Sequence, residues 1–259
     1  MTKQFSLILS ILFRILAGAI VKLNWETLGG GISDYDKAIE YSPKDDVVYM
    51  NRGEAKAHLK DYYGAIKDYN KAIEFNPKYS EAYYNRAISK HELKDYKGSV
   101  NDNTIAITIN PKYSKAYYNR GNSKVQLGEY RDAVLDYDLA IGFNPKFSEA
   151  YNSRGGAKSY LKNLNGAILD FNAAIGLNSM FIDAYCNRGF TKTNLGDYNG
   201  AISDYSKAIQ INPNKADAYF NRGLVKIAIG KDEAGCLDLK KAGEMGYEKA
   251  FISIKKHCN

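Results

Sequence analysis

A side chain suited to hydrogen bonding recurs every 34 residues along this chain, each time directly before an arginine. The row consists of Asn51, Asn85, Asn119, Ser153, Asn187 and Asn221. An asparagine amide offers both a donor and an acceptor, so a row of amides can pair with the backbone of an extended peptide. Two interpretations stay open: the row binds a partner, or each asparagine bonds within the scaffold and stabilises its packing.

A second row combines opposite charges in the same register. Its arginines are Arg52, Arg86, Arg120, Arg154, Arg188 and Arg222, and its aspartates are Asp34, Asp68, Asp102, Asp136, Asp170, Asp204 and Asp238. A lysine follows each arginine by four residues. Because the guanidinium fork can hold a carboxylate with two bonds, the pattern predicts buried or half-buried ion pairs between helices. A basic stripe for phosphates or acidic peptides is the alternative, which the matching aspartates disfavour.

Residues for catalysis or metal binding are isolated from one another. His58, His91 and His257 lie in no recognisable arrangement of base and nucleophile, and four zinc ligands at suitable spacing are missing from the sequence. The recurrent glycines follow the 34-residue period, so none of them indicates a phosphate-binding loop. We therefore expect a non-catalytic protein with no cofactor and no metal.

Composition is that of a folded protein. Hydrophobic residues make up 45% and charged residues 25% of the 259 residues. The net charge of +7 is compatible with an acidic partner or nucleic acid, but most of it recurs once per repeat. The odd cysteine count (Cys186, Cys236 and Cys258) argues against a disulfide framework and suggests a reducing compartment such as the cytoplasm.

The elements that must position these rows are paired helices. Six full copies cover 46–79, 80–113, 114–147, 148–181, 182–215 and 216–249, after an incomplete copy whose second helix covers 28–45, and residues 250–259 form a capping helix or tail. In the copy at 114–147 the first helix is expected over 115–127. It follows Ser114 as N-cap, with Ser80, Ser148 and Asp46 in that place elsewhere, and ends at Gly128, as other copies end at Gly196 and Gly230.

The second helix of each copy has its own signals. It begins after a capping residue (Asp61, Asp95, Asn163 or Asp197) and ends at Asn144-Pro145 in the copy at 114–147. A small residue sets the distance between the two helices of each copy; it is glycine or alanine at 53, 87, 121, 155, 189 and 223. We expect the large side chains that pack against these small residues to be the tyrosines at 49, 83, 117, 151, 185 and 219.

The apolar run at residues 5–21 is open to three interpretations. It is the first helix of a degenerate repeat, a signal peptide, or a membrane anchor, and Arg14 within it weakens the last two. Export or membrane association through this segment, which belongs to residues 1–27, is therefore the alternative to the cytoplasm.

The repeat resembles the tetratricopeptide repeat family. The resemblance rests on the 34-residue length and on Tyr117, Gly121, Leu127, Gly128, Tyr130, Ala133, Tyr137, Ala140 and Pro145. It implies an all-α, right-handed α-solenoid of stacked antiparallel helix pairs, whose first helices line a concave groove. It also implies that the asparagine row faces this groove, flanked by Tyr84, Tyr118 and Phe220, and that the protein is a scaffold binding a peptide segment of a partner protein.

Some members of the family hold a C-terminal carboxylate with basic residues beside the groove asparagines. One turn before its asparagines this chain has Val47, Glu81, Lys115, Glu149, Asp183 and Asp217. Only Lys115 is basic, so we expect basic or neutral segments as ligands. The alternatives are an RNA-binding helical-repeat protein, which the acidic residues disfavour, and a membrane-associated accessory subunit.

Overall fold

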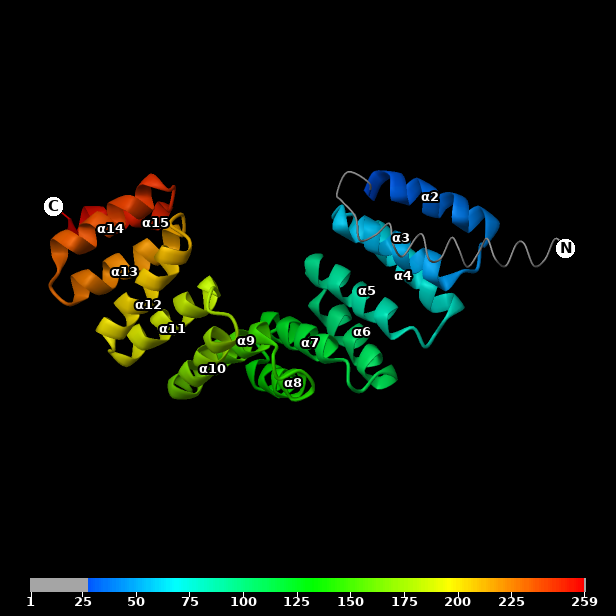
Figure 1. Ribbon diagram of the computed structural model, residues 1–259, viewed down its shortest axis with the longest axis horizontal. Coiled ribbons are helices and arrows are strands. Elements are labelled where there is room, and N and C mark those ends of the chain that lie inside the picture. Colours follow the sequence, from blue (N-terminus) through cyan, green and yellow to red (C-terminus); the bar gives the residue numbers. More distant parts are fainter. Residues whose placement is uncertain (1–27, 259) are drawn as a thin grey trace. The chain divides into compact units, whose positions relative to one another are not determined.

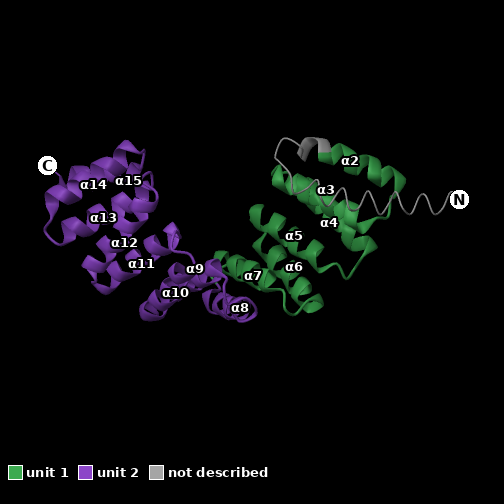
Figure 2. Ribbon diagram, in the orientation of Figure 1, with its two compact units in different colours: residues 1–128 green, residues 129–259 purple. Residues whose placement is uncertain are grey.

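The computed structural model describes residues 28–258, which form helices and no strand (Figure 1). The chain divides into two compact units at Gly128 (Figure 2). Unit 1 contains α2 (Leu28–Tyr41), α3 (Asp46–His58), α4 (Tyr62–Phe75), α5 (Ser80–Glu92), α6 (Tyr96–Ile109) and α7 (Ser114–Gln126). Unit 2 contains α8 (Tyr130–Phe143), α9 (Ser148–Tyr160), α10 (Leu164–Leu177), α11 (Ile182–Leu195), α12 (Tyr198–Ile211), α13 (Ala216–Ala228), α14 (Asp232–Glu244) and α15 (Glu248–His257).

Within each unit every helix packs on the next one along the chain. The first and second helices of a repeat form a pair, such as α3 with α4 or α9 with α10, and each second helix also contacts the following first helix. One helix pair cannot bury both of its apolar faces, so the stack of pairs builds the core. The expected all-α helical-repeat solenoid is confirmed.

The second helices begin as the sequence predicts. The side chains of Asp61, Asp95, Asn163 and Asp197 accept hydrogen bonds from the backbone N–H three residues later, at 2.9–3.1 Å. Each of these N–H groups belongs to a glycine, because a Cβ there would collide with the capping side chain. Asp or Asn followed three residues later by glycine therefore marks the start of a second helix.

The predicted caps of the first helices are wrong by one residue. Ser80, Ser114 and Ser148 are the first helical residues, and the capping position is held by Tyr79, Tyr113 and Phe147, which make no side-chain cap bond. The Ser80 and Ser148 hydroxyls donate instead to the carboxylates of the next residues. In α3 the cap is Asp45, one residue before the predicted Asp46.

The first helices stop in a left-handed residue. Gly128, Gly196 and Gly230 have φ of 80°, 80° and 76°, as expected. The same position in other repeats is held by Lys60, Lys94 and Lys162, whose φ values of 62°, 64° and 63° are unusual for a residue with a Cβ.

The large side chains that pack against the recurrent glycines are not the predicted tyrosines. An added Cβ at Gly53 would lie 2.7 Å from Cε1 of Tyr69, and one at Gly155 would lie 2.8 Å from Cε1 of Phe171. These rings come from the second helix of the same repeat, 16 residues later, and are almost completely buried. The predicted tyrosines lie beside the recurrent arginines instead, as Tyr49 does beside Arg52.

The C-terminal helix contradicts the expectation of unpaired cysteines. Cys236 in α14 and Cys258 after α15 form a disulfide, with their Cα atoms 5.6 Å apart. The pair is possible because α15 packs against α14. Cys186 is free and half-buried in α11.

The apolar run at 5–21 and the interpretations attached to it lie outside the described residues. Between residues 28 and 258, no helix is long and apolar enough to cross a membrane.

Candidate functional site

Each unit has an inner face, which we define as the surface formed by its first helices. In unit 1, α3 contacts α5 and α5 contacts α7; in unit 2, α9 contacts α11 and α11 contacts α13. These first helices therefore form a continuous row in each unit, and the residues predicted to bind a partner lie on it.

The asparagine row forms some of its bonds inside the scaffold. Asn187 Nδ2 donates to Asn152 Oδ1 at 3.0 Å, and Asn85 Nδ2 lies 4.0 Å from Met50 Sδ. Both partners are 35 residues earlier, on the preceding first helix. These two asparagines thus join neighbouring first helices, as the scaffold interpretation requires.

Other members of the row are placed differently. Asn119 Nδ2 is buried without a hydrogen-bond partner. Asn51, Ser153 and Asn221 are half-buried on their helices. The row therefore does not act as one uniform set of scaffold bonds.

Aromatic rings and acidic groups gather on the inner face of unit 1. The rings of Tyr84 and Tyr113 have their centroids 4.9 Å apart. Burial raises the pKa of both phenols, and the charges of Glu81 and Glu54 raise the pKa of Tyr113 further. Burial raises the pKa of Tyr79 to about 12, again with Glu81 and Glu54 contributing. This surface combines neighbouring aromatic rings with carboxylates.

On the inner face of unit 2, acidic residues pair with a lysine. Lys215 lies 3.0 Å from Asp183 and 3.6 Å from Asp217. The ring of Phe220 lies 4.9 Å from that of Tyr247. Burial raises the pKa of the Cys186 thiol to about 12, so this thiol stays protonated and is a poor nucleophile.

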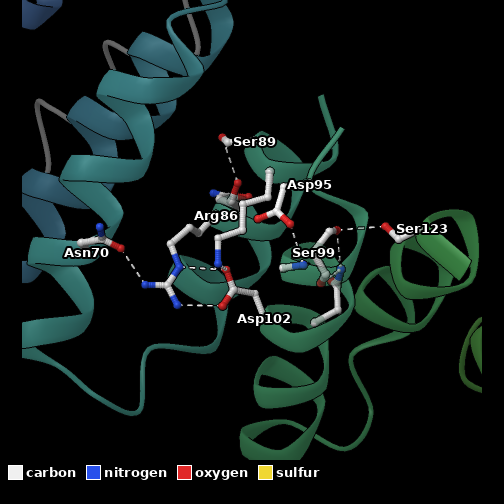
Figure 3. Close-up of polar contacts among 11 residues, drawn as sticks. Asn70, Arg86, Ser89, Asp95, Ser99, Asp102 and Ser123 are labelled. Carbon is white, nitrogen blue, oxygen red and sulfur yellow. Dashed lines mark hydrogen bonds and ion pairs between the residues drawn. The ribbon is translucent and has the colours of Figure 1, made fainter. Parts of the chain in front are cut away.

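Behind the inner face, the recurrent arginines and aspartates meet as charge-assisted pairs. Arg86 holds Asp102 with two bonds, Nε to Oδ2 at 2.8 Å and Nη2 to Oδ1 at 2.7 Å, and Lys90 reaches the same carboxylate at 2.8 Å (Figure 3). Asp102 is completely buried. The same geometry is found for Arg52 with Asp68, Arg154 with Asp170, Arg188 with Asp204, and Arg222 with Asp238.

The remaining members of this row are placed as follows. Arg120 lies in α7, where its Nη1 donates to Thr104 Oγ1 at 3.1 Å. Asp136 is buried in α8. Asp34 in α2 is more exposed than the other aspartates, and lies 3.9 Å from Lys37.

Each arginine makes a further contact that we did not predict from the sequence. Its Nη1 donates to a residue 16 positions earlier, on the second helix of the preceding repeat, as Arg86 does to Asn70 Oδ1 at 2.6 Å (Figure 3). The acceptors are Asp36, Asn70, Thr104, Asp138, Asn172 and Ser206. A signal was present, because every residue in this register can accept a hydrogen bond. The arginines therefore connect consecutive repeats.

The repeat at 80–113 carries a buried polar cluster around Ser99 and Asn103. Ser99 Oγ lies 2.9 Å from Ser123 Oγ, His91 Nδ1 lies 2.9 Å from the same atom, and Asn103 Nδ2 donates to the Ser99 carbonyl at 3.0 Å (Figure 3). Asn103 Oδ1 is buried with no partner. Ser99 stands where other repeats have alanine or, at residue 235, glycine, and Asn103 where they have Tyr, Phe or Leu.

Among residues 28–258, no group of three or more His, Cys, Asp or Glu side chains could hold a metal ion.

Family models for the tetratricopeptide repeat match residues 47–79, 68–100 and 114–147, and a model described as TPR repeat matches 191–230. The chain is a tetratricopeptide repeat protein. Repeats of this family generally act as non-catalytic scaffolds for protein–protein interaction. The search among curated proteins found no match.

Several solved structures share the fold. A tetratricopeptide repeat protein from Parabacteroides merdae ATCC 43184 is 24% identical, with a TM-score of 0.71 over 95% of this chain and 98% of that one. MamA is 26% identical (TM-score 0.58, 63% of this chain, 96% of that one). YrrB, described as having an unusual peptide-binding site, is 22% identical (TM-score 0.59, 73% and 97%).

Proposed function

We propose that this protein is a scaffold whose inner faces bind an extended segment of a partner protein. The observation that carries the proposal is the aromatic and acidic surface of unit 1, where the rings of Tyr84 and Tyr113 lie together and the first helices α3 and α5 carry Glu54 and Glu81. Aromatic faces bind both apolar and cationic side chains, and the carboxylates favour cations. The ligand is therefore a segment rich in lysine or arginine with apolar residues between them.

The proposal has support from a structural neighbour. YrrB, with the same fold, is described as a protein with a peptide-binding site. The asparagines of the inner face offer hydrogen-bonding groups on the same first helices. Asn119 has an amide nitrogen without an internal partner, and this amide becomes a donor to the ligand if a local shift exposes it.

A display library of random peptides tests the proposal directly. The intact chain is expected to select basic peptides with aromatic or aliphatic residues, and a Glu54→Gln/Glu81→Gln variant is expected to lose the preference for basic residues. Glu233→Gln, at an exposed glutamate on α14, is the matched control and should select like the wild type. Selection of acidic peptides, or equal selection by the wild type and the double variant, would show that unit 1 does not bind in this way.

A second experiment tests the asparagines. Capture of partners from native lysate with the intact chain is compared with Asn85→Ala/Asn119→Ala/Asn187→Ala, with helicity and melting measured for both. Partners lost from a variant that remains folded place the binding site on the inner faces. Partners retained at full strength assign the asparagine row to the scaffold.

Nucleic-acid binding is the competing function, because the net charge is +7. The arginines in five repeats hold carboxylates, which leaves them unavailable for phosphates. Steep loss of RNA binding with added salt would favour this alternative.

The cytoplasm is the proposed location, with export or membrane association through residues 5–21 as the alternative. The disulfide between Cys236 and Cys258 is a reason to test the alternative, since such bonds persist in oxidising compartments. Cell fractionation distinguishes the two.

A further inference from the structure

The outer faces of two neighbouring second helices in unit 2, α8 and α10, are unusually apolar. Leu135 and Leu139 on α8 are 61% and 44% exposed, and Leu169 on α10 is 68% exposed. Arg154 bonds both Asp138 of α8 and Asp170 of α10, so the two helices lie beside each other at this level. We call Leu135, Leu139, Gly142, Leu169, Ala173 and Gly176 the outer patch.

Most other second helices have two polar residues at the same positions; α6, with Ile105 and Thr108, is the exception. Where α8 has Leu139 and Gly142, α4 has Lys71 and Glu74, which bond at 2.8 Å. The same register carries Lys207 and Gln210 in α12, bonded at 3.0 Å, and Lys241 and Glu244 in α14, bonded at 3.2 Å. The repeats at 114–147 and 148–181 have thus replaced a solvated polar pair with an apolar or small residue followed by glycine.

The glycines of the outer patch need an explanation of their own. An added Cβ at Gly142 or Gly176 would meet no atom within 4 Å, so neither glycine is required by packing inside the chain. Glycine inside a helix is destabilising relative to alanine. An exposed glycine next to exposed leucines allows another backbone to approach closely.

The spacing of the outer patch makes it complementary to itself. Leu135 precedes Gly142 by seven residues, and Leu169 precedes Gly176 by the same interval, so each pair shares one helix face about two turns apart. Two copies of α8 placed antiparallel about the midpoint of this interval bring each Leu135 against Gly142 of the other copy. Symmetric pairs of this kind are the commonest form of protein self-association.

The distribution of charge allows a second copy to pack on the outer patch. A chain with a net charge of +7 repels its own kind, and lysines occupy the equivalent outer positions in other repeats. The outer patch lacks these lysines, and Arg154 lies 2.6 Å from the carboxylate of Asp138 at its edge. It is therefore a face on which two such chains can meet without repulsion.

We propose that two copies of this protein associate through the outer patch, with α8 and α10 of one copy packing on those of the other. This inference goes beyond the proposed peptide binding, because it uses the second helices and leaves the inner faces open.

The test is sedimentation analysis of the intact chain over a concentration series. The wild type is expected to approach twice the monomer mass. Leu139→Lys/Gly142→Glu, which installs the arrangement of Lys71 and Glu74, is expected to raise the dimer dissociation constant by about tenfold or more. Because the same pair is accommodated in α4, the variant should retain the helicity and melting of the wild type.

Leu237→Lys on α14 is the matched control, since this leucine is 67% exposed but is followed by Lys241 and Glu244. It should associate like the wild type. A second, positive test uses Leu139→Cys, close to the midpoint, which should form a disulfide between two copies when oxidised glutathione accepts the two electrons and two protons. A wild type that stays monomeric, or an unchanged dissociation constant in the Leu139→Lys/Gly142→Glu variant, overturns the proposal.

Discussion

The ring of Tyr69 occupies the space that a side chain at residue 53 would need. An added Cβ on Gly53 would lie 2.7 Å from Tyr69 Cε1 and 3.2 Å from the carbonyl oxygen of Ala65. Gly155 and Phe171 have the same relationship in unit 2. The glycine is thus required by the partner ring, which is why both recur with the repeat.

Gly53→Ala is expected to destabilise the fold by about 1–3 kcal/mol, because a buried ring and a backbone oxygen must move. Gly156→Ala, at a helical glycine with no atom within 4 Å, is expected to stabilise by about 0.5–1 kcal/mol. Urea unfolding measures both. Equal effects of the two substitutions would show that helix propensity alone sets the role of Gly53.

The repeat at 80–113 replaces both members of this pair, with Ala87 for the glycine and Asn103 for the ring. We expect Asn103→Tyr alone to be destabilising by about 1–3 kcal/mol through overpacking against Ala87. Ala87→Gly/Asn103→Tyr should recover stability, since it restores the pair and removes the buried, unpartnered Oδ1 of Asn103. A double-mutant cycle by urea unfolding checks this, and additive effects would contradict it.

Asp102 meets two cations in a buried position, so its removal leaves both of them without their partner. Asp102→Ala is expected to cost about 3–5 kcal/mol. Glu74→Ala, which removes an exposed partner of Lys71, is expected to cost about 0–1 kcal/mol. Replacing Arg86, Lys90 and Asp102 together by apolar residues should recover most of the lost stability. If the triple variant stays as unstable as Asp102→Ala, the carboxylate does more than neutralise these two cations.

The burial of His91 predicts that the stability of the fold depends on pH. Burial lowers the pKa of His91 below its ordinary value of 6.5, while the charge of neighbouring Glu92 opposes this shift, and the ring also contacts Ser123 and Tyr96. As pH falls below about 6.5, the unfolded state takes up a proton that the folded state resists. The free energy of unfolding should therefore decrease as pH falls through this range, and its full value should be present above it. His91→Gln should show a smaller fall, measured as melting temperature against pH. The same fall in wild type and variant would assign it to other groups.

The disulfide between Cys236 and Cys258 closes a loop with a sequence separation of 22. Cys258→Ser is expected to lower the stability of the α14–α15 region by about 3 kcal/mol. Hydrogen exchange of residues 248–257 reports the loss, and Cys186→Ser is the control without effect there. Titration of the denatured, unreduced chain should find one free thiol; three would exclude the disulfide.

Much of the fold could be predicted because its signals are local. The capping side chain of Asp61 and the glycine three residues later lie within one helical turn, and Asn144-Pro145 ends a helix by its own backbone chemistry. Repetition of these signals at a fixed interval is sufficient to predict stacked helix pairs. Arginine and aspartate also recur at this interval, always 16 residues apart, so the sequence places one on each helix of a pair.

The sequence by itself therefore determined the helices, their pairing and their repetition. The tertiary structure decided which side chains meet across helices: Tyr69 and not Tyr49 against Gly53, Asn70 as the additional partner of Arg86, and Cys258 beside Cys236. These contacts depend on the rotation of each helix about its axis and on how α15 packs against α14. Many rotations satisfy the same pattern, and only close packing of side chains selects one.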